Sequence, residues 1–346
     1  MIPLIAASGF RQLSTFFPIF SWARTYTRDD LMSDLIAGVI VAIMLVPQSM
    51  AYAVLAGLPP EVGLYASIVP LIMYGLLGTS RSLAVGPVAI VSLLVASGIS
   101  GLAEAGSAQY VELAVTLALL VGVVQFVMGV VRLGFLVNFL SHPVLSGFTS
   151  AAAIVIGFSQ LKHLLGFSVP RTEYFYEQVL YTLQHLTQTN GYALAIGLFS
   201  LGLLFYFKHK MASLLRAWHV PEGLVIPISK CGPLVVVLIG TLLVWGGSLH
   251  EQVAVVGKVP PGLPSLTMPQ LDVSVWQLLL PTALTISFVG YMESISVAKS
   301  LASKRREKVE PNQELVALGM ANLGGMLTGS YPVTGGFSRS SRPPQN

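Results

Sequence analysis

Charged residues are scarce in this chain. Asp, Glu, Lys and Arg make up 10% of its 346 residues, whereas a soluble globular domain carries about 25%. Hydrophobic residues make up 54%, and the mean hydropathy is +0.75. This composition excludes a disordered protein and an ordinary cytosolic enzyme.

Cysteine and clustered metal ligands are also lacking. The single cysteine, Cys231, excludes an intramolecular disulfide framework, and the six histidines show no metal-ligand spacing. We therefore expect no metal and no other cofactor. No apolar run gathers the groups that a membrane-embedded enzyme needs, so no enzyme is expected either.

Basic residues outnumber acidic ones, 19 to 15, but they are spread over the whole chain. Without a basic stripe and interleaved aromatic residues, the sequence does not predict nucleic-acid binding. Residues 1–30 contain no long apolar core, so no cleavable signal peptide is expected.

Long uncharged runs are what the sequence does contain. A transmembrane helix needs about 20 mainly apolar residues. Runs near this length, apolar except for Lys230, cover residues 35–57, 62–79, 113–131, 143–161, 189–207, 223–247, 273–292 and 315–331. The sequence therefore predicts an all-α polytopic membrane protein embedded in a lipid bilayer.

One further element, residues 82–99, has a different pattern. Its first residues suit an extended strand, and Gly86-Pro87 suits the start of a helix that runs to about Ile99. That helix is too short to cross a membrane alone. We predict a strand, a break and a half-helix, which persist at membrane depth only against protein or a watery cavity.

The distribution of basic residues predicts the orientation. The broken element brings the crossings before Tyr331 to nine. With the N-terminus inside, 13 of the 19 Lys and Arg residues lie in cytoplasmic segments and three in external loops. Because cytoplasmic loops carry the excess of Lys and Arg, we expect a cytoplasmic N-terminus in the plasma (inner) membrane.

A second interrupted segment, residues 329–338, follows the ninth span. It is rich in glycine and broken by proline, like residues 78–87, and seven spans separate the two. An odd number of spans inverts the second copy, and such a pair marks the substrate site of a transporter. Two unrelated glycine-rich turns are the alternative.

Several strings are more specific than these patterns. They are DLIAG at 34–38, VPQSMAYA at 46–53, AGLPP at 56–60, GLYAS at 63–67, GTSR at 78–81, VGP at 85–87, NQEL at 312–315 and GGFSRS at 335–340. In these strings, from about Asp34 to Ser340, the chain resembles the SulP family of sulfate permeases, which in animals is solute carrier family 26.

The resemblance implies two inverted repeats of seven segments, with the third and tenth segments broken. It implies a core domain that slides against a gate domain, commonly in a dimer, with a cytoplasmic STAS domain after them. Here it assigns 1–33 to a cytoplasmic segment, 34–133 to core segments one to four, 134–250 to gate segments five to seven, and 273–346 to core segments eight, nine and the start of ten. Segments eleven to fourteen and the STAS domain would be absent, and the second repeat incomplete.

The N-termini of the two predicted half-helices are suited to bind an anion. A helix N-terminus presents unpaired N–H groups and about half a positive charge. The predicted binding groups are Gly86, Pro87, Val88 and Ala89 at the first half-helix, and Phe337, Ser338 and Arg339 at the second. A solvated terminal arginine is the alternative for Arg339.

The resemblance adds two donors on the first helix, Gln48 and Tyr52. Their i, i+4 spacing places both on one helix face. An interhelical hydrogen bond for Gln48, and packing for Tyr52, are the alternatives.

Glu293 is the candidate for proton coupling. It lies beside a small polar helix face made by Ser287, Gly290 and Ser294, and intramembrane acids are commonly functional. The alternative is a glutamate that reaches water or pairs with a basic residue.

Together these features predict secondary active transport of an inorganic anion, first of all sulfate by proton symport with an elevator movement. Sodium-coupled bicarbonate transport and anion exchange stay open, as does an inactive truncated fragment.

Overall fold

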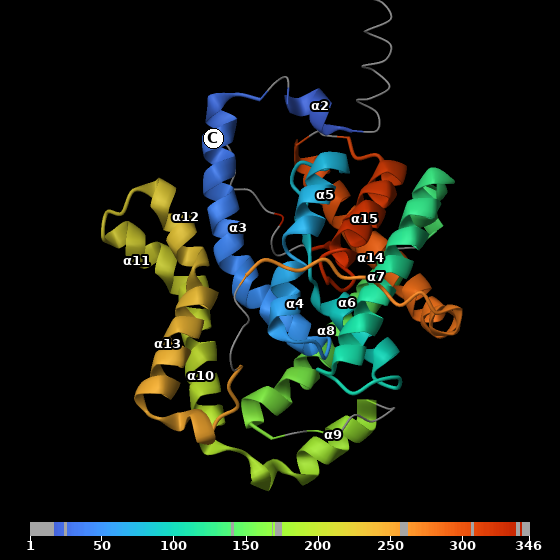
Figure 1. The fold of residues 1–346 in the computed structure, drawn as a ribbon. Helices are drawn as coiled ribbons and strands as arrows, with labels where there is room; N and C mark the ends of the chain where they lie inside the picture. Colours follow the sequence, from blue (N-terminus) through green and yellow to red (C-terminus); the bar gives the residue numbers. More distant parts are fainter. Residues whose placement is uncertain are drawn as a thin grey trace, which may run out of the picture. The chain divides into compact units, whose positions relative to one another are not determined.

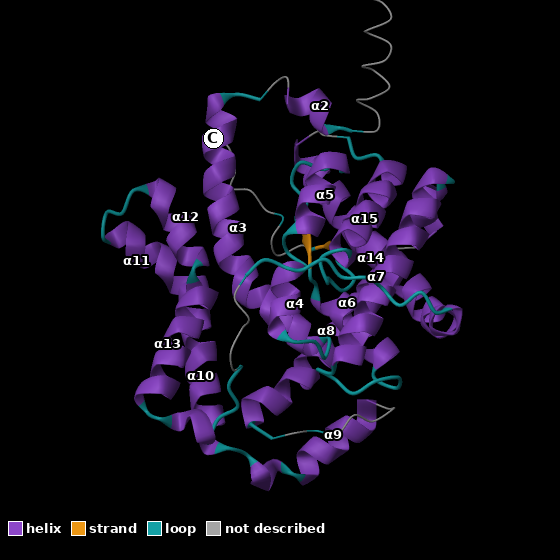
Figure 2. Ribbon diagram, in the orientation of Figure 1, coloured by secondary structure: helices purple, strands orange, loops and turns teal. Residues whose placement is uncertain are grey.

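The computed structural model describes residues 17–23, 26–139, 142–167, 169, 175–256, 262–305, 308–336 and 340. Figure 2 shows helices almost everywhere in this part of the chain, with one pair of short strands. The α-helices in Figure 1 are α2 (Ile19–Trp22), α3 (Arg28–Leu55), α4 (Pro60–Tyr65), α5 (Val69–Leu77), α6 (Ala89–Ile99), α7 (Ala108–Val130), α8 (His142–Leu165), α9 (Phe175–Gln184), α10 (Gly191–Tyr206), α11 (Ala212–Ala217), α12 (Glu222–Lys230), α13 (Gly232–Gly246), α14 (Val273–Arg305) and α15 (Pro311–Met326). The strands are β1 (Val85–Gly86) and β2 (Thr334–Gly335).

Five helical stretches in the described part of the chain are long and apolar enough to cross a membrane. A sixth is added when the bent pair α12 and α13 counts as one span. The nine predicted crossings include shorter elements that do not meet this length on their own, such as α6, with 11 residues. The predicted all-α membrane architecture is present.

Two predicted single spans each contain two helices. Residues 62–79 cover most of α4 and α5, which together count as one membrane-crossing stretch, Pro60–Leu77, whereas residues 223–247 cover α12 and α13 with a bend of 47°. Proline stands in the first turn of both α5 and α13, where its missing N–H costs nothing but prevents continuation of the preceding helix. The amphipathic helix α9 lies in a segment where the sequence predicts only a loop.

The chain divides into two compact units. The first consists of Met1–Val39, Gln48–Ser141 and Val259–Asn346, and the second consists of Ile40–Pro47 and His142–Lys258.

In the first unit α7 and α15 pack closely through glycines. A Cβ added to Gly319 would lie 2.5 Å from the backbone nitrogen of Phe126, and one added to Gly122 would lie 2.8 Å from Leu323 Cγ. Small residues let two helix backbones approach in this way. Around the contact Leu117, Val121 and Leu318 are fully buried.

In the second unit α10 begins at a capped end. Asn190 Oδ1 accepts hydrogen bonds from the backbone N–H groups of Tyr192 and Ala193. This satisfies donors that a helix N-terminus otherwise leaves unpaired. α10 continues through a turn of π-helix, Phe207–Met211, into α11.

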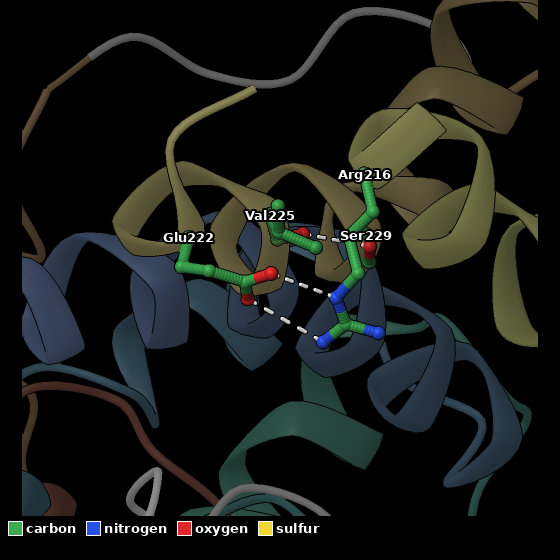
Figure 3. Close-up of polar contacts among 4 residues, drawn as sticks. All are labelled: Arg216, Glu222, Val225 and Ser229. Atoms are coloured by element: carbon green, nitrogen blue, oxygen red, sulfur yellow. Dashed lines mark hydrogen bonds and ion pairs between the residues drawn. The ribbon is translucent and has the colours of Figure 1, made fainter. Parts of the chain in front are cut away.

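An ion pair joins α11 to the start of α12 (Figure 3). Arg216 donates from Nε to Glu222 Oε1 at 2.9 Å and from Nη2 to Oε2 at 3.4 Å. Within α12, Ser229 Oγ donates to the carbonyl oxygen of Val225 at 2.7 Å. The side chains of the pair are 56% and 69% exposed.

We expect Arg216→Ala to leave the thermal midpoint of the purified protein within about 2 °C of wild type, because exposed ion pairs contribute little to stability. Intrinsic tryptophan fluorescence during heating measures this, with Glu222→Gln as the control that removes the other partner. A fall of about 10 °C in both variants would contradict the expectation and show that the pair is shielded from water.

Candidate functional site

The two interrupted segments meet in an antiparallel pair of strands. Val85 pairs with Gly335, and Gly86 pairs with Thr334. The N–H of Gly336 also donates to the carbonyl oxygen of Ala84 at 3.1 Å. A Cβ at Gly335 would lie 2.8 Å from the side chain of Leu83, which would have to shift to admit a larger residue at position 335. The two interrupted segments, which the sequence predicts to be a related pair, are thus hydrogen-bonded directly to each other.

α6 starts at the end of β1 with its first turn uncapped. Val88 occupies the N-cap position in an extended conformation (φ −134°, ψ 152°), and its apolar side chain makes no capping hydrogen bond. The predicted start at Pro87 is wrong by two residues. Pro87 belongs to the buried extended link, and the helix begins at Ala89. The first N–H groups of α6, beginning at half-buried Ala89, therefore form an electropositive end.

Side chains of α14 hold β2 in place. Thr334 Oγ1 donates to the carbonyl oxygen of Gly290 at 2.6 Å and lies 2.6 Å from Ser294 Oγ. Ser294 Oγ in turn accepts the N–H of Gly335 at 2.7 Å. The small polar face predicted for this helix therefore does contact protein, and it binds the strand directly.

α15 holds the residue before β2. Asn322 Oδ1 accepts the N–H of Val333 at 2.8 Å, and Nδ2 lies 3.1 Å from the carbonyl oxygen of the same residue. Nδ2 also lies 3.0 Å from Gln125 Oε1, and Gln125 Nε2 donates to the carbonyl oxygen of Ser287 at 3.3 Å. This buried network joins α7, α14 and α15 to the second extended segment.

A hydroxyl pair connects α6 to the same segment. Ser92 Oγ donates to the carbonyl oxygen of Val88 at 2.9 Å and lies 3.0 Å from Tyr331 Oη. Both residues are fully buried or nearly so. The N-terminal turn of α6 is therefore bound to the approach to β2 as well as continuous with β1.

Gln48 and Tyr52 lie on one face of α3, as their spacing predicts. Gln48 Nε2 donates to Tyr52 Oη at 2.9 Å, and both side chains are half-buried. Behind them α4 lies so close to Ser49 that Gly63 has no room for a Cβ. The structure therefore brings these two predicted residues together on one face of one helix.

The other predicted residues divide into two groups. Phe337, Ser338 and Arg339 lie outside the described residues. Glu293 is half-buried on α14, with its Oε2 atom inaccessible to solvent, and it is adjacent to Ser294, which binds β2. Glu293 is thus one residue away from the network that holds the second strand.

Glu314 is a further buried polar residue that the apolar pattern does not point to. Its carboxylate, at the start of α15, accepts hydrogen bonds from α5 and from the turn that leads to β1. The signal that could have found it is the string NQEL, in which it is the acidic residue.

The chemistry of this arrangement is that of neutral donors. Within the described residues, no three His, Cys, Asp or Glu side chains lie close enough to hold a metal ion. The hydroxyls and backbone N–H groups described around the strand crossing are hydrogen-bonded within the protein, so the groups that suit an anion are the first N–H groups of α6.

Comparison with known proteins covers almost the whole chain. The family model described as "Sulfate permease family" matches residues 31–342. "Sulfate transporter 4.1, chloroplastic" of Arabidopsis thaliana is 42% identical over 336 residues, which are 95% of this chain and 47% of the relative. "Sodium-independent sulfate anion transporter" of Bos taurus is 36% identical over 376 residues, 99% of this chain and 60% of the relative. The chain spans about half the length of the curated relatives it matches.

Solved structures show the same fold. The murine Solute Carrier 26 family member A9 anion transporter in the inward-facing state superposes with a TM-score of 0.84 at 27% identity, over 95% of this chain and 56% of that one. The transmembrane domain of the cyanobacterial bicarbonate transporter BicA gives a TM-score of 0.75 over 91% of this chain and 77% of that one, and at 22% identity this likeness concerns the fold alone. The fold class predicted from the sequence is confirmed, and the chain is a multi-pass membrane protein that belongs to the sulfate permease family.

Proposed function

We propose that this chain provides an anion-binding site of a secondary active transporter, which carries an inorganic anion, first of all sulfate, together with a proton. The observation that carries the proposal is the uncapped N-terminus of α6 at the crossing of β1 and β2. The printed names of two relatives, a plant and a bovine sulfate transporter, support sulfate as the first anion to test.

The α6 end supplies the main attraction for the anion. Moving an ion from water into a low-dielectric interior costs several kcal/mol of free energy unless nearby groups offset its charge. The N–H groups of the first turn of α6 and the helix dipole compensate it without a fixed cation. In the proposal Phe337, Ser338 and Arg339 also contribute to the site, with Arg339 adding positive charge.

Gln48 and Tyr52 complete the site with directional donors. Because Tyr52 Oη accepts the amide hydrogen of Gln48, its own hydroxyl proton is directed elsewhere and can be donated to an anion. The internal bond also limits the rotamers of both side chains, so less entropy is lost when the anion binds.

The transport movement is proposed from the division into units. An elevator needs one body that carries the substrate and another that stays fixed. The two compact units support that scheme, with the core formed by 34–133 and 273–346 and the gate by 134–250. We propose a homodimer of the full-length protein, with the N-terminus on the cytoplasmic side of the plasma (inner) membrane.

Proton coupling is proposed over sodium coupling because Val297, one turn beyond Glu293, supplies no oxygen ligand. Uptake of radiolabelled sulfate, bicarbonate and chloride into proteoliposomes, with proton or sodium gradients, separates sulfate symport from bicarbonate transport and exchange. Absence of both binding and uptake for all three anions would overturn the proposed function.

Gln48→Ala is expected to weaken sulfate binding about tenfold to a hundredfold, since a hydrogen bond to a charged group contributes about 1.5–3 kcal/mol. Equilibrium binding of radiolabelled sulfate to purified protein measures the change. The matched control is Gln160→Ala, which removes an exposed glutamine of α8 whose amide donates to Ser159 Oγ. Equal affinities of the folded Gln48 variant and wild type would remove Gln48 from the site.

A further inference from the structure

Glu314 is a fully buried carboxylate surrounded by hydrogen-bond donors. Tyr74 Oη donates to Oε2 at 2.7 Å. Oε1 accepts from the backbone N–H of Thr79 at 2.8 Å, from Thr79 Oγ1 at 2.5 Å and from the backbone N–H of Ser80 at 3.1 Å. One carboxylate thus connects the start of α15 to both α5 and the turn that follows it.

Two neighbouring hydrogen bonds strengthen the same junction. Gln313 Nε2 donates to the carbonyl oxygen of Leu77, the last residue of α5, at 2.8 Å. The N–H of Glu310 donates to Thr79 Oγ1 at 3.2 Å. The first turn of α15 therefore fixes the turn that leads into β1.

The same helix fixes both strands of the crossing. Near its other end, Asn322 binds the backbone of Val333, just before β2. Glu314 binds residues 79 and 80, a few residues before β1. Since β1 continues through Pro87 and Val88 into α6, a displacement of this turn also displaces the N-terminus of α6.

We infer that Glu314 is a positioning residue for anion binding, which holds the turn before β1 and thereby sets the position of the α6 N-terminus. The inference rests on the proposed function, in which that N-terminus binds the anion. Glu314 acts through the backbone, and its role is to accept the hydrogen bonds of the turn.

The chemistry of the donors makes this role testable. The N–H groups of Thr79 and Ser80 can only donate, so they need an acceptor at Oε1. Glutamine provides one, because its carbonyl oxygen can occupy the Oε1 position while its NH₂ group donates to Tyr74 Oη. Alanine provides none and leaves two buried N–H groups unpaired. If Glu314 acts by positioning the turn, Glu314→Gln should preserve anion binding. If its negative charge is what matters, Glu314→Gln should impair anion binding.

The experiment combines hydrogen–deuterium exchange of residues 79–95 with equilibrium binding of sulfate, both on the whole purified chain. We expect Glu314→Ala to speed exchange in this segment about tenfold and to weaken sulfate binding about tenfold. Glu314→Gln should stay within about threefold of wild type in both measurements. The control is Glu112→Ala, which removes an exposed carboxylate of α7 that accepts a hydrogen bond from Gln270, and it should match wild type.

Three results would overturn the inference: unchanged exchange in Glu314→Ala, faster exchange with unchanged affinity, or a glutamine variant as impaired as the alanine variant. If Glu314→Ala does not fold, Tyr74→Phe decides, because it removes the hydroxyl that donates to Oε2 and leaves the carboxylate in place as the acceptor for the N–H groups of the turn. We then expect an increase of about threefold in both exchange and dissociation constant, and no change in either would overturn the inference. A wild-type protein that binds no sulfate refutes the proposed function, and the exchange measurements still show separately whether Glu314 holds the turn.

Discussion

Asn322→Leu is expected to cause the largest loss of stability among single substitutions at the strand crossing. The side chain is 1% exposed. Its Oδ1 accepts the N–H of Val333 at 2.8 Å, and its Nδ2 lies 3.0–3.1 Å from three acceptors, the carbonyl oxygens of Leu318 and Val333 and the side-chain oxygen of Gln125. Leucine fills a similar volume but leaves the N–H of Val333 and the amide oxygen of Gln125 buried and unpaired.

Each buried group that loses its partner costs about 1–3 kcal/mol, so the two groups give an expected total loss of about 2–6 kcal/mol. Thermal unfolding in detergent, followed by tryptophan fluorescence and by the folded fraction in gel filtration, measures it. Asn190→Ala is the control, because it removes the cap of α10 and one exposed hydrogen bond to the carbonyl oxygen of Gln252, and it should cost about 1 kcal/mol.

A double-mutant cycle tests the mechanism. Gln125→Leu alone should also destabilise the protein, since it removes one acceptor of the Asn322 amide and a donor to the carbonyl oxygen of Ser287. With both substitutions, the loss should be smaller than the sum of the single losses, because the unpaired groups of one variant are removed by the other. Strict additivity would show that the two side chains are not coupled, and wild-type unfolding of Asn322→Leu would show that its hydrogen bonds do not stabilise the protein.

The broken third element could be predicted because its signals are local. Gly86-Pro87 lies between a short extended pattern and an apolar run, and the structure has a strand followed by a half-helix there. The start of the helix was off by two residues because proline fits both an extended link and a helical first turn. Pairing of β1 with β2 determined which of the two it adopts, and no local pattern encodes a partner in a distant segment.

The end of α15 shows the same limit. The apolar run continues to Tyr331, but the helix ends at Met326. Gly329 adopts a positive φ of 69° in the turn that follows, and Val333 is bound by Asn322. The glycines are visible in the sequence, whereas the side chain that captures the turned chain is identified only by the fold.

Site residues were predictable where a helix brings them together and not where packing does. The contact between Gln48 and Tyr52 follows from their spacing on α3. Glu314 lies at the edge of an apolar run, where a carboxylate usually faces water. Its burial arises because the turn after α5 presents two N–H groups to it, and that arrangement depends on the packing of α5 against α15.

Glu293 precedes in sequence the residue of α14 that binds β2. It is half-buried on α14, and its Oε2 atom is inaccessible to solvent. The next residue, Ser294, binds Thr334 and Gly335 of β2. An anion bound at this crossing and an ionised Glu293 would repel each other, so protonation of Glu293 and anion binding would favour each other. Such reciprocal coupling is what a proton symporter requires.

Glu293→Gln is therefore expected to abolish accumulation of sulfate driven by a proton gradient while leaving sulfate binding and sulfate exchange in place. Glutamine is neutral and nearly the same shape, so it imitates the protonated state at every pH and cannot release the proton that completes the cycle. The measurement is uptake of radiolabelled sulfate into proteoliposomes with an inward proton gradient, compared with exchange at equal pH on both sides. Glu112→Gln, which changes an exposed carboxylate on α7, is the matched control and should accumulate sulfate as wild type does. If Glu293→Gln still concentrates sulfate in response to the gradient, Glu293 is not the coupling group, and its carboxylate instead reaches water or pairs with a basic residue.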